Sequence, residues 1–266
     1  MGWGGMGDGI RSSVLFVHHS NSNPTIMRKK ILMIGNTAGL PGVPVDISDY
    51  YNFFTSPAGG HWYDEEIDIL LNPTQHDLLE AIAEIEEADY DYLIIVFSGH
   101  GEETSDGTVL SINGQEETIL LHNLTELAER QLLIIDCCRS HRRIPDDINI
   151  DSTTLSLSHD SIRQAYEELI QFAAPQEVIL FACNDSEVSV DTREGRIYSY
   201  SQCLLRAIQS ALTNPRLRFV SVGRAHYKAV SLMRQECLYF EQHPTMLQSP
   251  CSVHRRLPLA VNTRYL

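Results

Sequence analysis

Positive charge is scarce in this sequence. Its 266 residues include 20 Lys and Arg against 35 Asp and Glu, which gives a formal net charge of −15. A protein that binds nucleic acid or an anionic membrane neutralises phosphates with clustered basic residues. The scarcity therefore argues against both partners and leaves room for a site that attracts cationic substrates. We expect most of the acidic residues to lie on a solvated surface.

Cysteines are also few, and none of them forms a metal-binding or redox motif. All six lie in the second half of the chain, and no two are spaced as C-x-x-C. Zinc ribbons and thioredoxin-like sites need that spacing, and a disulfide scaffold needs a higher cysteine density. We therefore predict no bound metal or other cofactor, and we favour a reducing, cytoplasmic setting.

Long hydrophobic runs are missing as well. No run approaches the roughly 20 apolar residues of a membrane-spanning helix, and Val14–Val17 is too short for a signal peptide. Residues 1–29, rich in Gly, Ser and Asn, are interpreted as a flexible N-terminal extension. A Gly-rich phosphate loop and a G-x-S-x-G nucleophile elbow are both absent, which weakens the case for several other α/β enzymes.

From residue 30 onward, short apolar runs alternate with amphipathic segments. The predicted strands are Ile31–Gly35, Ile67–Leu71, Tyr92–Phe97, Leu132–Ile135 and Val178–Ala182, with a hairpin of Val109–Ile112 and Thr118–Leu121 around a tight Asn113-Gly114 turn. The predicted helices are Asp46–Phe54, a segment capped by Thr74, Leu124–Glu129, Asp160–Phe172, Tyr198–Leu212 and Arg224–Phe240. Such alternation predicts an α/β domain over residues 30–266, with a mostly parallel central sheet and helices on both faces.

Two of the most apolar predicted strands run directly into reactive side chains. Tyr92–Phe97 is followed by Ser98-Gly99-His100-Gly101, and Leu132–Ile135 by Asp136-Cys137-Cys138-Arg139-Ser140. Ligands bind at the carboxyl ends of parallel strands, so His100 and a cysteine are expected at the same edge of the sheet. A thiol beside an imidazole can be held as a thiolate, and the imidazole can then protonate a leaving amine. The order His then Cys, about forty residues apart, is consistent with a caspase-like signature.

With these motifs the sequence resembles the caspase-like cysteine peptidases of the metacaspase and orthocaspase type, and we expect a prokaryotic source. The resemblance extends from Lys30 over nearly the whole chain. Its weaker matches are Leu40-Pro41-Gly42 ahead of Asp46, Ala182-Cys183-Asn184-Asp185, Gly195 with Tyr198-Ser199, and Gln242-His243-Pro244. The resemblance implies a caspase-hemoglobinase fold with a large-subunit-like part up to residue 143, a linker at 144–158 and a small-subunit-like part at 159–266.

The resemblance also implies roles for individual residues. His100 would be the general acid/base, and Cys138 the nucleophile, because Cys138-Arg139-Ser140 stands where the family has Cys followed by Arg or His and then Gly or Ser. Cys137 would fill a position for a small residue. The backbone N–H groups of Gly101 and Cys138 would hold the oxyanion.

A preference for basic residues before the cleaved bond is implied too. Caspases that cut after Asp carry an arginine just ahead of the first helix, but Gly42–Val45 contains no basic residue. Metacaspases cut after Arg or Lys and use acids, and the matching positions are Asp46 and Asp136, with Ser98 beside them. Asp185 is a further substrate-binding candidate. Buried carboxylates bind a guanidinium strongly, so we predict cleavage of protein substrates after Arg, with Lys in second place.

Several alternatives stay open at this stage. Asp46 could be a helix N-cap and Asp136 a structural acid. The chain could be an inactive caspase-fold interaction module, a peptidase with non-basic specificity, or a different α/β enzyme with a catalytic cysteine. The segment around the linker could be an activation loop cut at Arg142, Arg143 or Arg163, or an ordinary surface loop.

Regulation and partners are expectations from the family alone. Calcium activation stays open, because Asp146, Asp147 and Asp151 form no recognisable ligand motif. Stand-alone proteases of this type often act in antiviral defence or programmed cell death by cleaving an effector protein. We therefore expect a protein substrate and a regulatory or effector protein as partners.

Overall fold

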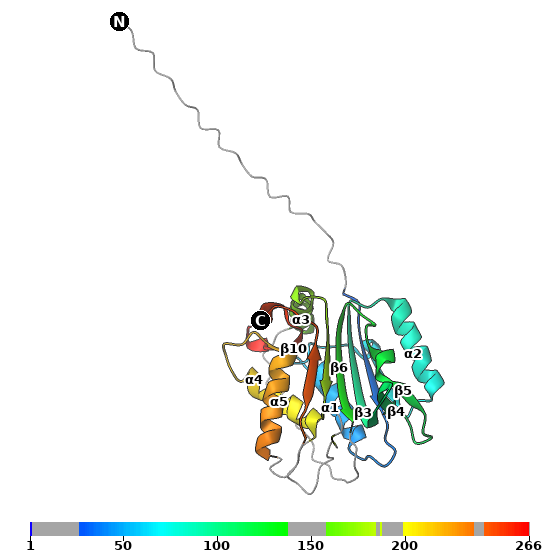
Figure 1. Cartoon of the computed structure of the whole chain (residues 1–266). Helices are drawn as coiled ribbons and strands as arrows, with labels where there is room; N and C mark the ends of the chain where they lie inside the picture. Colours follow the sequence, from blue (N-terminus) through cyan, green and yellow to red (C-terminus); the bar gives the residue numbers. More distant parts are fainter. Residues whose placement is uncertain (2–26, 138–157, 185–186, 188–198, 237–241, 266) are drawn as a thin grey trace.

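The computed structural model describes residues 1, 27–137, 158–184, 187, 199–236 and 242–265. In this part of the chain, eight strands form the main sheet, with β2-β1-β3-β6-β7-β9 in order and β4 and β5 attached beside β3. Pairing is parallel from β2 to β7, whereas β9 joins antiparallel. The prediction of a mostly parallel sheet is confirmed (Figure 1).

The strands of the main sheet are β1 (Lys29–Gly35), β2 (Ile67–Leu71), β3 (Tyr92–Thr104), β4 (Gly107–Ser111), β5 (Thr118–Leu120), β6 (Arg130–Cys137), β7 (Gln176–Phe181) and β9 (Thr245–Gln248). A separate pair is formed by β8 (Phe219–Ser221) and β10 (Pro258–Val261). The α-helices described are α1 (Val43–Thr55), α2 (Gln75–Ala88), α3 (His159–Phe172), α4 (Tyr200–Leu212) and α5 (Val222–Glu236). The first strand thus begins one residue before the predicted start of the domain.

The sheet separates two hydrophobic clusters because side chains alternate along its strands. In β3, Ile94 and Val96 face the cluster that contains residues of α1, α3, α4 and α5. Leu93, Ile95 and Phe97 face the other cluster, which contains the buried side chains of α2. Helices therefore cover both faces, as predicted, and the two faces are called the α1 face and the α2 face below.

β3 extends seven residues further than predicted and changes partners along its length. Its first part pairs with β1 and β6, up to Ser98 and Gly99, in parallel register. From His100 onward it pairs antiparallel with β4, with which it is joined by a short turn. Gly107 ends this turn with a φ of 112°, a conformation that favours glycine. The strand thus carries His100 to the point where parallel pairing ends.

Two local predictions between β4 and β6 are wrong. The helix expected at Leu124–Glu129 is replaced by a 3₁₀ turn, η2 (Leu121–Leu124), and an irregular segment. The buried Gln131 side chain accepts hydrogen bonds from the backbone N–H groups of Leu127 and Ala128, so these groups need no helix. The turn at Asn113-Gly114 is not a tight one either, because Ile112 N–H donates to the carbonyl of Glu117 across a longer loop.

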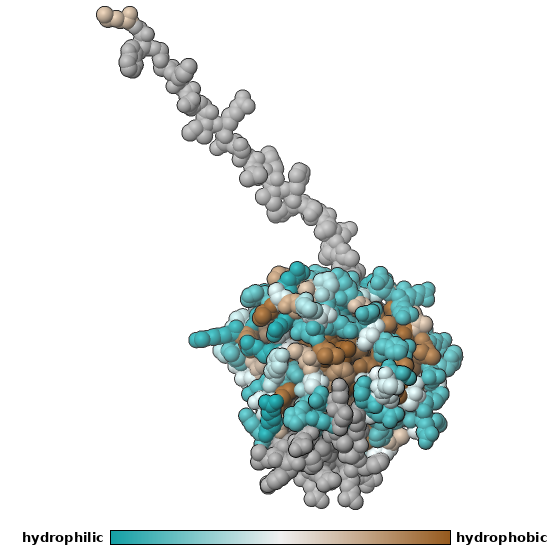
Figure 2. Space-filling view, viewed as in Figure 1, coloured by the Kyte–Doolittle hydropathy of each residue, from teal (hydrophilic) through white to brown (hydrophobic). Residues whose placement is uncertain are grey.

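On the face shown in Figure 2, hydrophilic residues predominate, with apolar patches between them. Most of the described acidic residues are exposed, which agrees with the expectation that most charge is solvated. Among the described residues, no helix is both long enough and apolar enough to cross a membrane.

Candidate active site

His100 lies half-buried in β3, the strand between β1 and β6, at the carboxyl edge of the parallel part of the sheet. Its Nε2 atom is 3.0 Å from the carbonyl oxygen of Ala38, in the loop after β1. A carbonyl only accepts hydrogen bonds, so Nε2 carries the proton of the neutral ring and Nδ1 carries the lone pair. Nδ1 is therefore the nitrogen that can act as a base.

The residue whose carbonyl contacts His100 is held through its backbone N–H by a buried asparagine. Asn36 accepts a hydrogen bond from Ala38 N–H on its Oδ1 atom, at 3.0 Å. Its Nδ2 atom donates to the carbonyls of Ser111 and Asn113, at 2.8 and 3.3 Å. The Asn36 side chain thus ties the loop after β1 to the end of β4, and it was not predicted as a site residue.

Three of the predicted substrate-binding residues lie together on the α1 face. Ser98 and Asp136 are register partners near the point where the parallel pairing of β3 with β6 ends. Ser98 Oγ donates to Asp46 Oδ2 of α1 at 2.9 Å. All three side chains are buried. Asp46 lies inside the first turn of α1, whose N-cap is Gly42, so the alternative that Asp46 is the N-cap is wrong.

Negative charge in this cluster affects the neighbouring tyrosines. Burial raises the pKa of Tyr50 well above its ordinary value of 10, and the charges of Asp136 and Asp46 raise it further. Burial raises the pKa of Tyr200 in the same way, again with a contribution from Asp136. Both tyrosines therefore remain neutral at neutral pH.

Two serines complete this cluster, and sequence reasoning missed them. Ser199 Oγ donates to Asp46 Oδ1 at 3.3 Å, and Ser201 Oγ donates to Asp136 Oδ2 at 2.5 Å. Both are buried in the first turn of α4. The capping-box spacing Ser199 to Gln202 was a signal for the start of a helix, but no local pattern indicated which acids it would meet.

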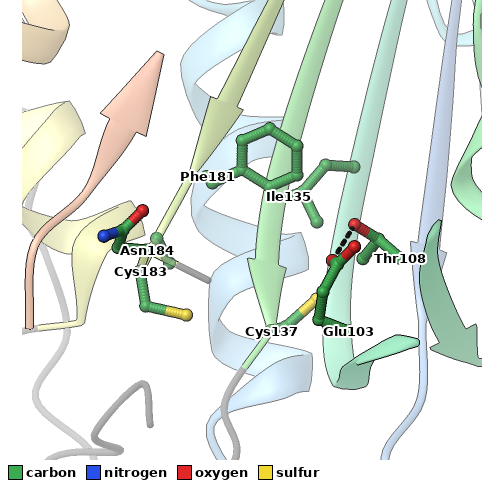
Figure 3. A pocket seen from close by; sticks show the side chains of 8 residues that line it. Glu103, Thr108, Ile135, Cys137, Phe181, Cys183 and Asn184 are labelled. Carbon is green, nitrogen blue, oxygen red and sulfur yellow. Dashed lines mark hydrogen bonds between the residues drawn. The ribbon is translucent and has the colours of Figure 1, made fainter. Parts of the chain in front are cut away.

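Cys137 points to the opposite face of the sheet. It packs with the α2-face cluster and is 5% exposed. A Cβ atom added to Gly101 would lie 2.7 Å from Cys137 Sγ, so the two residues are in close contact. Cys137 and Cys183 line a pocket of about 290 Å³ at the ends of β6 and β7, with Phe181 and Glu103 beside them (Figure 3). This position fits the interpretation of Cys137 as a small residue that serves packing.

Several predicted residues lie outside the described residues. They are Cys138, Asp185, Arg142, Arg143 and the predicted linker at 144–158 with its acids; of this linker only Ser158 is described. Arg163 is described and lies inside α3, where its guanidinium pairs with Glu66 and Glu167. Cleavage after Arg163 would require this helix to unfold, so Arg163 is a poor site for self-cleavage.

Metal ligands do not gather in the part of the chain that is described. No group of three or more His, Cys, Asp or Glu is placed there to hold a metal ion. The serines and carboxylates of the α1 face are instead suited to a cationic organic group, because a guanidinium donates to carboxylates in a fixed fork.

Comparison with known proteins identifies the family and the fold of the chain. The family model for the caspase domain matches residues 28–254. The initiator caspase Dronc of Drosophila has a similar structure, with a TM-score of 0.53 and 10% sequence identity over 98% of this chain and 96% of that chain. Caspase-1 from Spodoptera frugiperda matches with 15% identity and a TM-score of 0.47 over 89% of this chain and 87% of that chain. No curated protein matches the sequence.

The predicted fold and the predicted caspase-like family are thus confirmed. The metacaspase or orthocaspase type, the prokaryotic source and the roles of the individual site residues remain predictions. The structural likeness to Dronc, at low identity, concerns the fold, and the family model covers most of the sequence. The chain belongs to the caspase domain family of cysteine peptidases.

Proposed function

We propose that the chain is a cysteine endopeptidase that cleaves protein substrates after Arg, with Lys in second place. The observation that carries this proposal is the buried pair of carboxylates, Asp46 and Asp136, on the α1 face beside the end of β3. Two buried like charges are costly unless hydrogen bonds or a cation compensate them. The arginine side chain of a substrate supplies such a cation.

In this mechanism, His100 and Cys138 form the catalytic dyad. Nδ1 of His100 accepts the thiol proton, and the thiolate attacks the carbonyl carbon of the scissile bond. The protonated imidazole then gives its proton to the leaving amine, and water hydrolyses the acyl-enzyme with His100 as the base. The N–H groups of Gly101 and Cys138 stabilise the oxyanion.

The direction of Cys137 supports Cys138 as the nucleophile. Successive side chains of an extended strand point to opposite faces. Asp136 faces the α1 side and Cys137 the α2 side, so continued alternation would turn the next residue toward the face of Ser98 and His100. A thiol on the α2 face would have the sheet between itself and the carboxylates.

Labelling with an arginine-containing electrophile tests the dyad. We expect the wild-type protein and Cys137→Ala to be labelled, and Cys138→Ala and His100→Ala to be unreactive. An inactive interaction module would leave the wild-type protein unlabelled. Labelling that is lost in Cys137→Ala and retained in Cys138→Ala would contradict the assignment of the nucleophile.

Peptide libraries that vary the residue before the cleaved bond test the specificity. Asp46→Asn and Asp136→Asn should each lower kcat/KM for Arg peptides on the order of 100-fold, because an uncompensated cation would then enter a buried site. Asp160→Asn, the same change at an exposed acid of α3, is the control. A wild-type preference for Asp or Leu would favour a peptidase with non-basic specificity and refute this part of the proposal.

We further propose that the enzyme cuts and activates an effector protein in antiviral defence or programmed cell death, in the cytoplasm. This part rests on the family and on no particular residue. Incubation with the products of neighbouring genes should yield a fragment that ends in Arg. Self-cleavage at Arg142 or Arg143 is proposed as the activating step, and a Cys138→Ala protein that still nicks itself would refute it. Calcium activation is tested by assaying the chelated and calcium-loaded protein side by side.

A further inference from the structure

The first turn of α4 donates hydrogen bonds to both candidate substrate-binding acids. Ser199 Oγ lies 3.3 Å from Asp46 Oδ1. Ser201 reaches Asp136 Oδ2 twice, through Oγ at 2.5 Å and through its backbone N–H at 3.0 Å. An ionised carboxylate only accepts, so the serine groups are the donors. One helical turn therefore holds two acids that belong to different elements, α1 and β6.

Ser199 combines this contact with the capping of its own helix. Its Oγ accepts the N–H of Gln202 at 3.2 Å, while Gln202 Oε1 accepts the N–H of Ser199. Because Oγ is the acceptor in the cap, its own proton is directed to Asp46. The N-terminal end of a helix also carries partial positive charge, which stabilises carboxylates nearby. These donors from α4 offset part of the cost of burying the two carboxylates but supply no counter-charge, which is left for a substrate cation.

The intervening residue fixes the turn from the other side. The hydroxyl of Tyr200 lies 2.8 Å from Nδ1 of His226 in α5, and both side chains are buried. On the far side of Asp46, Ser98 Oγ donates to Oδ2. Asp46 consequently has a hydroxyl donor on each carboxylate oxygen, from β3 and from the residue that caps α4.

We propose that Ser199 and Ser201 are positioning residues that set specificity by holding the two carboxylates in the orientation a guanidinium requires. This inference rests on the proposed cleavage after basic residues. A guanidinium donates through a planar fork and needs correctly oriented acceptors, whereas an ammonium is a compact point charge that tolerates misorientation. Loss of the serine hydroxyls should therefore cost Arg substrates more than Lys substrates. Damage to the fold alone would cost both equally.

The test compares matched Arg and Lys peptides with the wild-type protein, Ser201→Ala and Ser199→Gly. Glycine is a good N-cap, so Ser199→Gly removes the contact to Asp46 while the helix loses little. We expect each variant to lower the Arg-to-Lys ratio of kcat/KM about tenfold, mainly through KM, since a hydrogen bond to a charged group is lost. Ser201→Thr keeps a hydroxyl and should retain the ratio. Ser210→Ala, at an exposed position of the same helix, is the control.

Binding of small cations gives a readout that needs no turnover. Agmatine carries a guanidinium group and cadaverine carries only ammonium groups. We expect agmatine to raise the Tm of the wild-type protein more than cadaverine does. Ser201→Ala should lose this difference. If Ser201→Ala does not fold, Ser201→Cys, which is similar in size and a weaker donor, takes its place with the same expected fall.

Two results would overturn the inference, and they differ from a failure of the proposed function. Equal losses for Arg and Lys peptides, or an unchanged ratio, would mean that the serines only support the fold. A wild-type protein that cleaves after neither residue and binds neither cation would refute the proposed function itself, before any variant is made.

Discussion

Replacing His226 with Asn should remove part of the protein's sensitivity to acid. His226 lies in α5, is 2% exposed and contacts the Tyr200 hydroxyl of α4. Burial lowers the pKa of His226 from its ordinary 6.5 to about 4. As the pH falls, the unfolded chain therefore takes up a proton on this histidine before the folded protein does. The folded state therefore loses stability as the pH falls from the pKa of the unfolded chain to the pKa of the folded protein.

The gap between the two pKa values fixes the size of the effect. It corresponds to a loss of about 3 kcal/mol of unfolding free energy. This loss is absent at neutral pH and nearly complete at pH 4. Asparagine places a polar atom near the position of Nδ1 but does not titrate. Its cost in helix propensity and packing is the same at every pH, so it cancels when the pH dependences are compared.

Urea unfolding, followed by fluorescence and circular dichroism from about pH 7 to pH 4.5, measures this difference. The unfolding free energy of the wild type should fall more steeply with acid than that of His226→Asn. His122→Asn, the same substitution at an exposed histidine, corrects for the loss of one histidine from the unfolded chain. Parallel curves for the wild type and His226→Asn would refute the reasoning, because a buried neutral histidine must resist protonation.

Three further substitutions test other contacts. Asn36→Ala removes the acceptor of the Ala38 N–H and loosens the loop whose carbonyl contacts His100, the proposed general base, so kcat should fall about tenfold while KM stays within about twofold; a change in KM alone would contradict this. Gly101→Ala places a Cβ 2.7 Å from Cys137 Sγ and should lower kcat on the order of 100-fold by displacing the N–H that we propose binds the oxyanion, with recovery in the double variant that adds Cys137→Ala. Glu66→Gln weakens the pairing of the buried Lys29 ammonium, 3.3 Å away, and should lower the unfolding free energy by about 2 kcal/mol in urea titrations.

Much of the sheet could be predicted because its strands are continuous apolar runs. Ile67–Leu71 was predicted with its observed bounds, and Thr74 is the N-cap of α2 as expected. The short strands β8, β9 and β10 were missed, since segments of three or four residues carry no readable alternation. They become strands because partners distant in the sequence supply their hydrogen bonds, as β7 does for β9.

The candidate site divides in the same way. His100 and Asp136 could be located from sequence, because each directly follows an apolar run and parallel strands deliver such residues to one edge. Asn36 and Ser201 could not, because their roles depend on contacts 75 and 65 residues away. Gln131 shows how a tertiary contact can also defeat a local prediction. Its buried side-chain amide binds the backbone of the segment before it, which was predicted to be helical and is not.

The adjacent cysteines show how backbone geometry can sharpen an assignment that a motif alone suggests. From the motif, Cys138 was preferred over Cys137 by the residues that follow it. The strand gives a separate argument against Cys137, since its thiol packs on Gly101 at the α2 face while the carboxylates lie on the α1 face. In the mechanism we propose, the nucleophile reaches both His100 and the bond beside a residue held by those carboxylates. That mechanism requires a thiol on the side of Asp136 and not on the side of Cys137, and the sequence offers Cys138 as the next cysteine.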